Sequence, residues 1–346
     1  MTRRSAFPPG RPPPRLRRLP LPADAADLRW LEAAARLAAR GQPLSRPNPA
    51  VGALLVRAGR VVGRGWTQPG GRPHAEAMAL EAAGEAARGA TLYVTLEPCA
   101  HASPRGPACA DLTASAGLAR VVIGCSDPDP RTAGAGAARL TEAGVPVDQV
   151  DSPACTTSLA GYLTRTRLGR PRVTLKLALS LDGALALPNG ESRWITGPAA
   201  RAHTHALRAR TDAILVGGGT LRTDAPRLDV RLPGLAGRSP ERWVLTGGTA
   251  PAGWRAIPAP AAIHGLSPAQ TLFVEGGART AAAFLAADLV DQLLIYRAPI
   301  VIGAGRPGIA DLGLTSLGDA HGRWCQVDRR TLGSDTLEVY ERTRST

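Results

Sequence analysis

Two successive runs of alternating strand and helix patterns limit this chain to α/β folds. The first run includes a buried-type strand over residues 91–96 and helical segments rich in alanine. A break at residues 169–171 (Gly-Arg-Pro) ends this run, and a new strand pattern begins at residues 173–181. Such alternation predicts sheets covered by helices, and the length of 346 residues suits two domains. We therefore expect domains over residues 24–169 and 170–346.

The individual elements follow from hydrophobic periodicity and from turn residues. In the first half we expect strands over residues 51–56, 60–65, 91–96, 120–125 and 145–150 and helices over residues 27–39, 74–87, 109–116, 136–143 and 159–167. In the second half we expect strands over residues 173–181, 213–216, 243–245, 272–275 and 292–297 and helices over residues 198–210 and 279–287. Residues 246–272 are rich in Gly, Pro and Ala and show no strand pattern, so we expect no strand–helix unit there.

Charge and composition narrow the class of protein. The formal net charge is +14, and residues 1–23 form a Pro/Arg-rich tail that lacks the apolar residues needed to fold, so we expect disorder there. A positive field attracts anions such as phosphorylated small molecules. No apolar run approaches the ~18 residues of a membrane helix, and the start of the chain does not resemble a secretory signal. An odd count of five cysteines argues against a disulfide framework, and we expect a cytoplasmic protein.

A histidine, an acid and two cysteines form the clearest chemical pattern. His74 and Glu76 are followed by Pro98-Cys99 and then by Cys109. Zinc favours nitrogen and sulfur ligands in a tetrahedral array, and a catalytic site keeps the fourth position for water. Glu76 lies in the first turn of a predicted helix, where it can move a proton between that water and a leaving amine. This pattern is typical of zinc-dependent nucleobase deaminases, except that nine residues separate the cysteines here instead of two.

Other interpretations of the same residues stay open. His74 can cap a helix while both cysteines are buried thiols, which are common in protein cores. The zinc pattern also fits a non-catalytic zinc-stabilised binding module. A nucleic-acid or free-nucleoside deaminase is a further alternative, but aromatic residues for base stacking make up only 4% of the chain, so we expect no nucleic-acid partner.

Six further segments along residues 26–310 are distinctive: PNPAVG (47–52), YVTLEPCAH (93–101), DP (127–128), LKLALSLDG (175–183), GESRWIT (190–196) and VEGG (274–277). In this order they resemble the motifs of one family, the bifunctional deaminase/reductases of riboflavin biosynthesis. The resemblance implies a cytidine-deaminase-like three-layer domain followed by a dihydrofolate-reductase-like α/β domain. It also implies zinc-dependent deamination of a diamino-ribosylamino-pyrimidinone phosphate, and then NADPH-dependent reduction of the ribosyl group to ribityl.

The resemblance assigns roles in the deaminase half. His74, Cys99 and Cys109 would bind Zn²⁺, and Glu76 would be the catalytic proton shuttle. Asn48 and His101 would contact the pyrimidine and Arg105 the phosphate, although each also suits an ordinary turn or loop residue. The loop between the cysteines is one residue longer than is usual in the family. Thr67 and Asp129 stand where family members usually have His and Asn.

The resemblance also assigns roles in the reductase half. The residues that would line NADPH are Ala178, Trp194, Thr220, Asp224, Gly277, Ala278, Arg279 and Thr280. The residues that would hold the substrate are Lys176, Ser192, Arg208, Leu228, Arg231 and Glu275. Lys176 and Glu275 form a plausible charged pair near the reacting sugar. Ala225 replaces a usual Asp or Asn, so a deaminase with an impaired or scaffolding reductase half is an alternative, and a homo-oligomer could form through this half.

Overall fold

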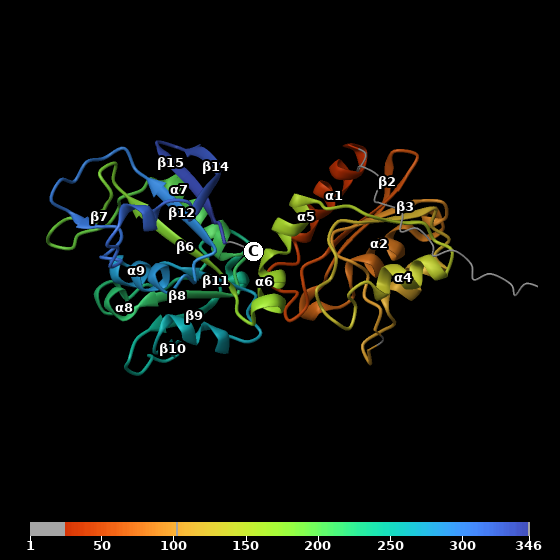
Figure 1. Cartoon of the computed structure of the whole chain (residues 1–346), viewed down its shortest axis with the longest axis horizontal. Helices are drawn as coiled ribbons and strands as arrows, with labels where there is room; N and C mark the ends of the chain where they lie inside the picture. Colours follow the sequence, from red (N-terminus) through yellow and green to blue (C-terminus); the bar gives the residue numbers. More distant parts are fainter. Residues whose placement is uncertain (1–24, 102, 345–346) are drawn as a thin grey trace, which may run out of the picture.

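The protein has two lobes, which lie side by side in Figure 1. The computed structural model describes residues 25–101 and 103–344, so the predicted disordered tail lies outside the described residues. We call residues 25–168 the amino-terminal lobe and residues 172–344 the carboxy-terminal lobe. Each lobe is built around its own sheet, as the alternating sequence patterns predict.

The amino-terminal lobe contains a five-stranded mixed sheet. Its strands, in the order β2-β1-β3-β4-β5, are β2 (Arg60–Trp66), β1 (Gly52–Arg57), β3 (Thr91–Val94), β4 (Arg120–Ile123) and β5 (Val147–Gln149). Strand β1 is antiparallel to both of its neighbours, whereas β3, β4 and β5 are parallel. The helices are α1 (Ala25–Ala38), α2 (Ala75–Ala83), α3 (Cys109–Ser115), α4 (Ala135–Glu142), α5 (Pro153–Ser158) and α6 (Ala160–Leu168).

Helices cover both faces of this sheet, because its strands are apolar on both sides. On one face, Leu31 of α1 and Cys155 of α5 pack with Leu54 and Tyr93 from the sheet. On the opposite face, α2 and α4 contribute Ala79 and Leu140 to a second cluster that contains residues such as Leu55 and Val121. The result is the predicted three-layer arrangement, in which the amino ends of α2 and α3 lie near the end of β3.

The carboxy-terminal lobe contains an eight-stranded sheet in the order β10-β9-β8-β11-β6-β12-β15-β14. These strands are β6 (Arg172–Leu179), β8 (Ala213–Gly217), β9 (Glu241–Leu245), β10 (Arg255–Ile257), β11 (Thr271–Val274), β12 (Gln292–Arg297), β14 (Trp324–Leu332) and β15 (Asp335–Arg342). The first six positions are parallel, and β15 and β14 close the sheet as an antiparallel hairpin. The helices are α7 (Pro198–Arg208), α8 (Gly218–Asp224) and α9 (Ala278–Ala286), and β7 (Ala184–Ala186) pairs with β13 (Arg306–Pro307).

The expectation that a strand–helix unit is missing between residues 246 and 272 is wrong. This segment contains β10, which is parallel to β9, and a 3₁₀ helix, η4 (Pro260–Gly265). Both are too short to produce a periodic pattern, but Ile257 and Ile263 are buried in the core of the lobe. The unit is therefore shortened, and the sheet continues through it.

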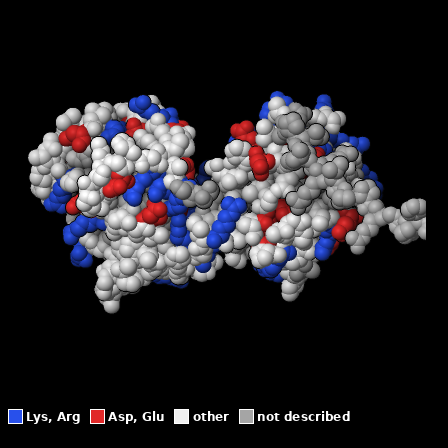
Figure 2. All heavy atoms as spheres, in the orientation of Figure 1, with Lys and Arg blue, Asp and Glu red and all other residues white. Residues whose placement is uncertain are grey.

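The surface carries the basic charge that the composition predicts. Figure 2 shows Lys and Arg side chains on both lobes of the face in view and in the narrow region between them. Many guanidinium groups are paired locally, for example Arg139 with Asp111 and Arg342 with Asp288. None of the described helices has the length and apolar character needed to span a membrane.

Candidate functional site

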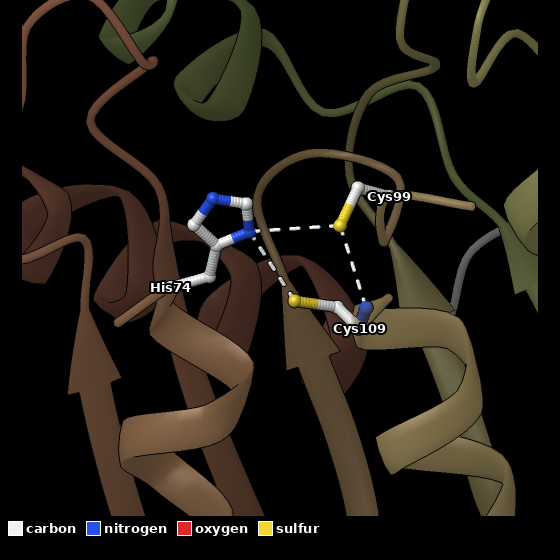
Figure 3. Close-up of side chains that lie close together, drawn as sticks. All are labelled: His74, Cys99 and Cys109. Carbon is white, nitrogen blue, oxygen red and sulfur yellow. Dashed lines mark hydrogen bonds between the residues drawn. The ribbon is translucent and has the colours of Figure 1, made fainter. Parts of the chain in front are cut away.

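His74, Cys99 and Cys109 converge at one end of the amino-terminal sheet (Figure 3). His74 is the residue before α2, Cys99 lies in the loop that follows β3, and Cys109 is the first residue of α3. The Nδ1 atom of His74 lies 3.6 Å from Cys99 Sγ and 3.3 Å from Cys109 Sγ. All three ligand atoms lie within 4.8 Å of one another. The structure therefore brings together the three residues that the sequence analysis selected as ligands.

The donor set and its spacing fit zinc. With Zn–N near 2.0–2.1 Å and Zn–S near 2.3 Å, a tetrahedral site holds nitrogen and sulfur about 3.5 Å apart. The two His74–Cys distances, 3.6 and 3.3 Å, lie close to this value. Three protein ligands leave one position for water, which is the arrangement of a catalytic zinc site and not of a closed structural one.

The electrostatics of the two sulfurs also favour a bound cation. The hydrogen bond with Cys109 lowers the pKa of Cys99 to about 3, whereas the bond with Cys99 and burial raise the pKa of Cys109. A divalent ion between the two sulfurs would stabilise both as thiolates, the form in which cysteine binds zinc.

Glu76 is the second residue of α2 and is only 3% exposed. Burial raises the pKa of its carboxyl group, and interactions with the nearby His74 ring and with Cys109 oppose this shift. The carboxyl group therefore lies beside the ligand cluster. A carboxyl group in this place can both accept and return a proton next to the metal position.

Asn48 contacts the zinc ligand His74 directly. Its Nδ2 atom lies 2.9 Å from His74 Nε2 and donates to the carbonyl of Gly71 at 3.0 Å. This contact occupies the ring nitrogen opposite Nδ1 and so fixes the rotation of the imidazole. His101 lies beyond Cys99 in the same loop, and its buried Nδ1 atom has no hydrogen-bond partner among the described residues. An unpaired buried nitrogen suits a group that bonds to substrate.

Arg105 lies on the surface of the loop between the cysteines, where its Nη2 atom donates to the carbonyl of Gly70 at 2.6 Å. A second guanidinium, which was not predicted from the sequence, lies at this loop. Arg72 donates to the carbonyl of Pro107 at 3.1 Å and its charge reaches Cys109. No motif marks Arg72, because its position depends on how the loop folds back toward α2.

The two departures from the family pattern have clear local partners. Thr67 is buried, and its hydroxyl accepts a hydrogen bond from the backbone N–H of Val51 at 2.9 Å. Asp129 forms a two-pronged pair with Arg131, which lowers the pKa of its carboxyl group. Thr67 thus fastens the start of β1, and Asp129 carries a charge that Arg131 largely neutralises.

Glu97 is a further residue that the sequence analysis did not select. It is 4% exposed, and its carboxylate accepts backbone hydrogen bonds from Gly134 at 3.0 Å and Ala137 at 3.1 Å. These N–H groups belong to the start of α4, where a negative charge is favourable. Because Glu97 is two residues before Cys99, it fixes the loop that carries a metal ligand.

A second candidate site lies at the carboxyl ends of β8 and β11, which are neighbouring parallel strands. A Cβ atom at Gly217 would lie 2.2 Å from Thr280 Oγ1, and one at Gly276 would lie 2.4 Å from Thr280 Cβ. Glycine is therefore required for α9 to approach the sheet this closely. The backbone of Gly277, Ala278, Arg279 and Thr280 opens α9 without a side-chain cap, and Thr220 of α8 lies alongside. Uncapped N–H groups at such a strand end suit a phosphate.

Lys176 and Glu275 interact electrostatically, but the direct ion-pair partner of Glu275 is Arg208. Arg208 of α7 binds both carboxylate oxygens of Glu275, at 2.6 and 2.9 Å. Burial alone would raise the pKa of Glu275, but Arg208 holds it below its ordinary value. Lys176, next to Ala178 on β6, points its ammonium toward the ring of Tyr296 at 5.9 Å. Burial lowers the pKa of Lys176; the carboxylate of Glu275 opposes this shift and the Arg208 cation adds to it.

Asp229 contacts two of the residues predicted to bind the substrate in this lobe, Arg208 and Arg231. Its carbonyl accepts hydrogen bonds from Arg208 at 3.1 Å and lies 3.1 Å from His205 Nδ1, and its carboxylate pairs with Arg231 at 3.2 Å. Leu228, just before it, is buried with a φ of 53°. Asp229 and His205 were missed by the sequence analysis, because their relevance depends on the approach of α7 to this loop.

The segment that contains Ser192 and Trp194 is tied to the end of α8. Arg193 Nη2 donates to the carbonyl of Asp224 at 2.9 Å. Trp194 is 64% exposed, and Arg201 lies over its ring at 4.7 Å. Ala225 ends α8 with a φ of 39°, a conformation that Asn and Asp adopt more readily than Ala.

Two family models match this chain. The cytidine and deoxycytidylate deaminase zinc-binding region matches residues 25–125, and the RibD C-terminal domain matches residues 171–251 and 264–337. The riboflavin biosynthesis protein RibD of Haemophilus influenzae is 36% identical over 363 residues, covering 91% of this chain and 97% of that protein. The chain belongs to the RibD family. The relative from Escherichia coli is 37% identical and covers 84% of this chain and 93% of its own length.

Solved structures agree with this assignment. RibD of Acinetobacter baumannii superposes with a TM-score of 0.81 at 33% identity, covering 92% of this chain and 99% of that one. A Thermotoga maritima protein superposes with a TM-score of 0.82 at 29% identity and the same coverage. That protein is described as a diaminohydroxyphosphoribosylaminopyrimidine deaminase/5-amino-6-(5-phosphoribosylamino)uracil reductase. The family, the two-part fold and the zinc-binding deaminase region predicted from the sequence are confirmed, and both enzyme regions of the family are present.

Proposed function

We propose that this chain catalyses two consecutive steps of riboflavin biosynthesis on a phosphorylated pyrimidine, a hydrolytic deamination followed by an NADPH-dependent reduction. The convergence of His74, Cys99 and Cys109 beside the buried carboxyl group of Glu76 is the observation that carries the proposal. We assign the deaminase to residues 24–169 and the reductase to residues 170–346. We also propose a cytoplasmic location, no nucleic-acid partner, and a homo-oligomer formed through the reductase half.

The deamination assigns a distinct task to each group. His74, Cys99 and Cys109 would hold a Zn²⁺ ion, which would supply Lewis-acid activation of water at neutral pH. Glu76 takes a proton from the attacking water and gives it to the leaving amine, so that water and an aminated ring carbon become a carbonyl and ammonia. Asn48 and His101 orient the pyrimidine, and Arg105 binds its phosphate, a task to which a guanidinium is well suited.

The reduction belongs to the carboxy-terminal lobe. Bound NADPH would supply the hydride, and the residues of this lobe would position it against the substrate. We propose that the uncapped start of α9 binds the cofactor phosphates and that the cofactor is lined by Ala178, Trp194, Thr220, Asp224, Gly277, Ala278, Arg279 and Thr280. We propose that the substrate is held by Lys176, Ser192, Arg208, Leu228, Arg231 and Glu275. The lowered pKa of Lys176 suits a group that releases a proton as the sugar ring opens.

Mass measurement of the diamino substrate after incubation tests both steps. Without NADPH we expect an amine to be replaced by a carbonyl oxygen, and with NADPH the further addition of two hydrogens. A deaminated product that is never reduced would instead support a deaminase with an inactive reductase lobe. If neither change occurred, the proposed function would be wrong.

Glu76→Gln tests the role of the carboxyl group. We expect zinc to remain at one per chain while deaminase turnover falls by about 10²–10⁴, the usual contribution of a general acid–base group. Glu81→Gln, on the exposed side of the same helix, is the matched control and should retain full turnover. A Glu76→Gln variant with normal turnover would remove Glu76 from the mechanism.

A further inference from the structure

The two lobes are joined by a contact that reaches the deaminase site. Gln270, directly before β11 in the carboxy-terminal lobe, donates its side-chain amide to two carbonyl groups of the amino-terminal lobe. The acceptors are Pro47, at 3.0 Å, and Asn48, at 3.1 Å. These two residues form the segment that presents the Asn48 side chain to His74. A residue of one lobe thus holds the backbone beside the metal ligands of the other.

Asp212 fixes both sides of this contact. Its buried carboxylate accepts hydrogen bonds from the backbone N–H groups of Gln270 at 2.8 Å and Thr271 at 2.9 Å. Its other oxygen pairs with Arg46 Nε at 3.1 Å, and the carboxyl side chain is only 4% exposed. Asp212 therefore anchors Gln270, which donates the two hydrogen bonds, and Arg46, which directly precedes the accepting residues Pro47 and Asn48. A shared buried anchor leaves little freedom for the two segments to move apart.

The Asn48 side chain is confined from the other side as well. It lies between His74 Nε2, at 2.9 Å, and the carbonyl of Gly71, at 3.0 Å. A Cβ atom at Gly71 would lie 2.7 Å from Asn48 Cγ, so the amide packs directly on the backbone of the loop before α2. Because the side chain has no spare room, its direction depends on where the Pro47–Asn48 backbone is held.

We propose that the carboxy-terminal lobe completes the deaminase site, with Gln270 as a positioning residue that sets the Asn48 amide for the pyrimidine. This inference rests on the proposed function, because it takes Asn48 as a pyrimidine contact. Gln270 lies at the amino end of β11, whereas the proposed NADPH-binding residues lie at the carboxyl ends of β8 and β11. The contact can therefore be altered without touching the groups assigned to the reduction.

Steady-state kinetics on the full-length zinc-loaded protein test this inference. In Gln270→Ala we expect the deaminase KM to rise about tenfold while kcat changes less than about twofold, since the loss of two neutral hydrogen bonds is of this order. Zinc content and NADPH-dependent reduction of the deaminated intermediate should stay unchanged. Gln270→Glu has the same size but directs a carboxylate at two carbonyl oxygens, so its KM should rise at least as much.

Arg238→Ala is the matched control. Arg238 also crosses between the lobes, and donates to the carbonyl groups of Gln42 and of Arg40, the latter at 3.1 Å. It contacts the same loop between α1 and β1 but not Asn48. Its removal should therefore leave the deaminase KM within about twofold of the wild-type value. An equal rise in KM for Arg238→Ala would show general docking of the lobes, and would overturn the assignment to Gln270.

The outcomes separate this inference from the function on which it rests. If the wild-type protein failed to deaminate the substrate, the proposed function would fail. If the wild-type protein deaminated it and Gln270→Ala had an unchanged KM, only the positioning role would fail. Loss of both activities in Gln270→Ala would also overturn it, since the contact would then support the fold and not the site.

Discussion

Glu97 offers a test of how the fold holds a metal ligand in place. In Glu97→Gln the side chain keeps its size, and its remaining oxygen can still accept the N–H of Ala137, 3.1 Å from Oε1. The new amide nitrogen would replace Oε2, which accepts the N–H of Gly134 at 3.0 Å and, more weakly, that of Asp127 at 3.4 Å. The N–H groups of Gly134 and Asp127 would then face the side-chain amide nitrogen, which is also a donor. Water cannot easily separate them, because the Glu97 side chain is only 4% exposed.

The expected cost follows from these bonds. A hydrogen bond to a charged acceptor contributes about 1.5–3 kcal/mol, and the long bond from Asp127 contributes less. Loss of the charge at the start of α4 adds about 0.5 kcal/mol. We therefore expect Glu97→Gln to lower the free energy of unfolding by about 3 kcal/mol. Because Glu97 precedes Pro98 and Cys99, zinc affinity should also fall about tenfold, the lower end of the range for groups that support metal ligands.

Urea denaturation and competition with a zinc chelator measure the two effects. Glu142→Gln is the matched control, because Glu142 is exposed and lies at the last turn of α4, the helix whose start Glu97 caps. It should change stability by less than about 0.5 kcal/mol. A loss below about 1 kcal/mol in Glu97→Gln, together with unchanged zinc affinity, would refute the reasoning that this carboxylate fixes the Cys99 loop.

Two further predictions concern the ion pair at the start of the second sheet and the metal. Asp291 binds Arg170 at 2.7 and 2.9 Å, and although burial opposes it, this contact holds the pKa of Asp291 below its ordinary value. Asp291→Asn should therefore destabilise the protein by about 3 kcal/mol at neutral pH. The difference should begin to shrink as the pH falls below about 4, where the unfolded acid takes up its proton, and should vanish at the lower pH at which the folded acid is protonated too. Urea denaturation at neutral and at acidic pH checks this, and a difference independent of pH would contradict it. Zinc removal by a chelator should abolish ammonia release but leave NADPH oxidation with the deaminated intermediate, and equal loss of both would show that the lobes do not work separately.

Local patterns were sufficient to predict most of the elements. The hairpin of β1 and β2 turns at Ala58 and Gly59, with φ values of 49° and 71°, and its apolar strands made it visible in the sequence. The hairpin of β14 and β15 was not predicted. Strand β14 is mostly exposed and carries polar residues such as Asp328 and Arg330, so it shows no apolar alternation. Its pairing depends on β15, which lies against β12.

The metal ligands could be predicted from the sequence alone. His74, Cys99 and Cys109 lie at the starts of helices or after a strand, and such ends meet at one edge of a sheet once the element order is known. Their chemistry is also narrow, since few functions need an imidazole and two thiols with a carboxyl group beside them. The side-chain types and the local structure together were enough to predict the site.

The tertiary structure alone decided which distant groups pair. Glu275 takes Arg208 and not Lys176 as its partner, because α7 crosses to the end of β11 and a guanidinium can bind both carboxylate oxygens. Gln270 reaches Asn48 across 222 positions of the chain. Neither contact has a periodic or local signal, since each forms only where two separately folded segments pack together. Sequence periodicity reports the environment along one segment, whereas the choice of partner depends on the packing of the whole chain.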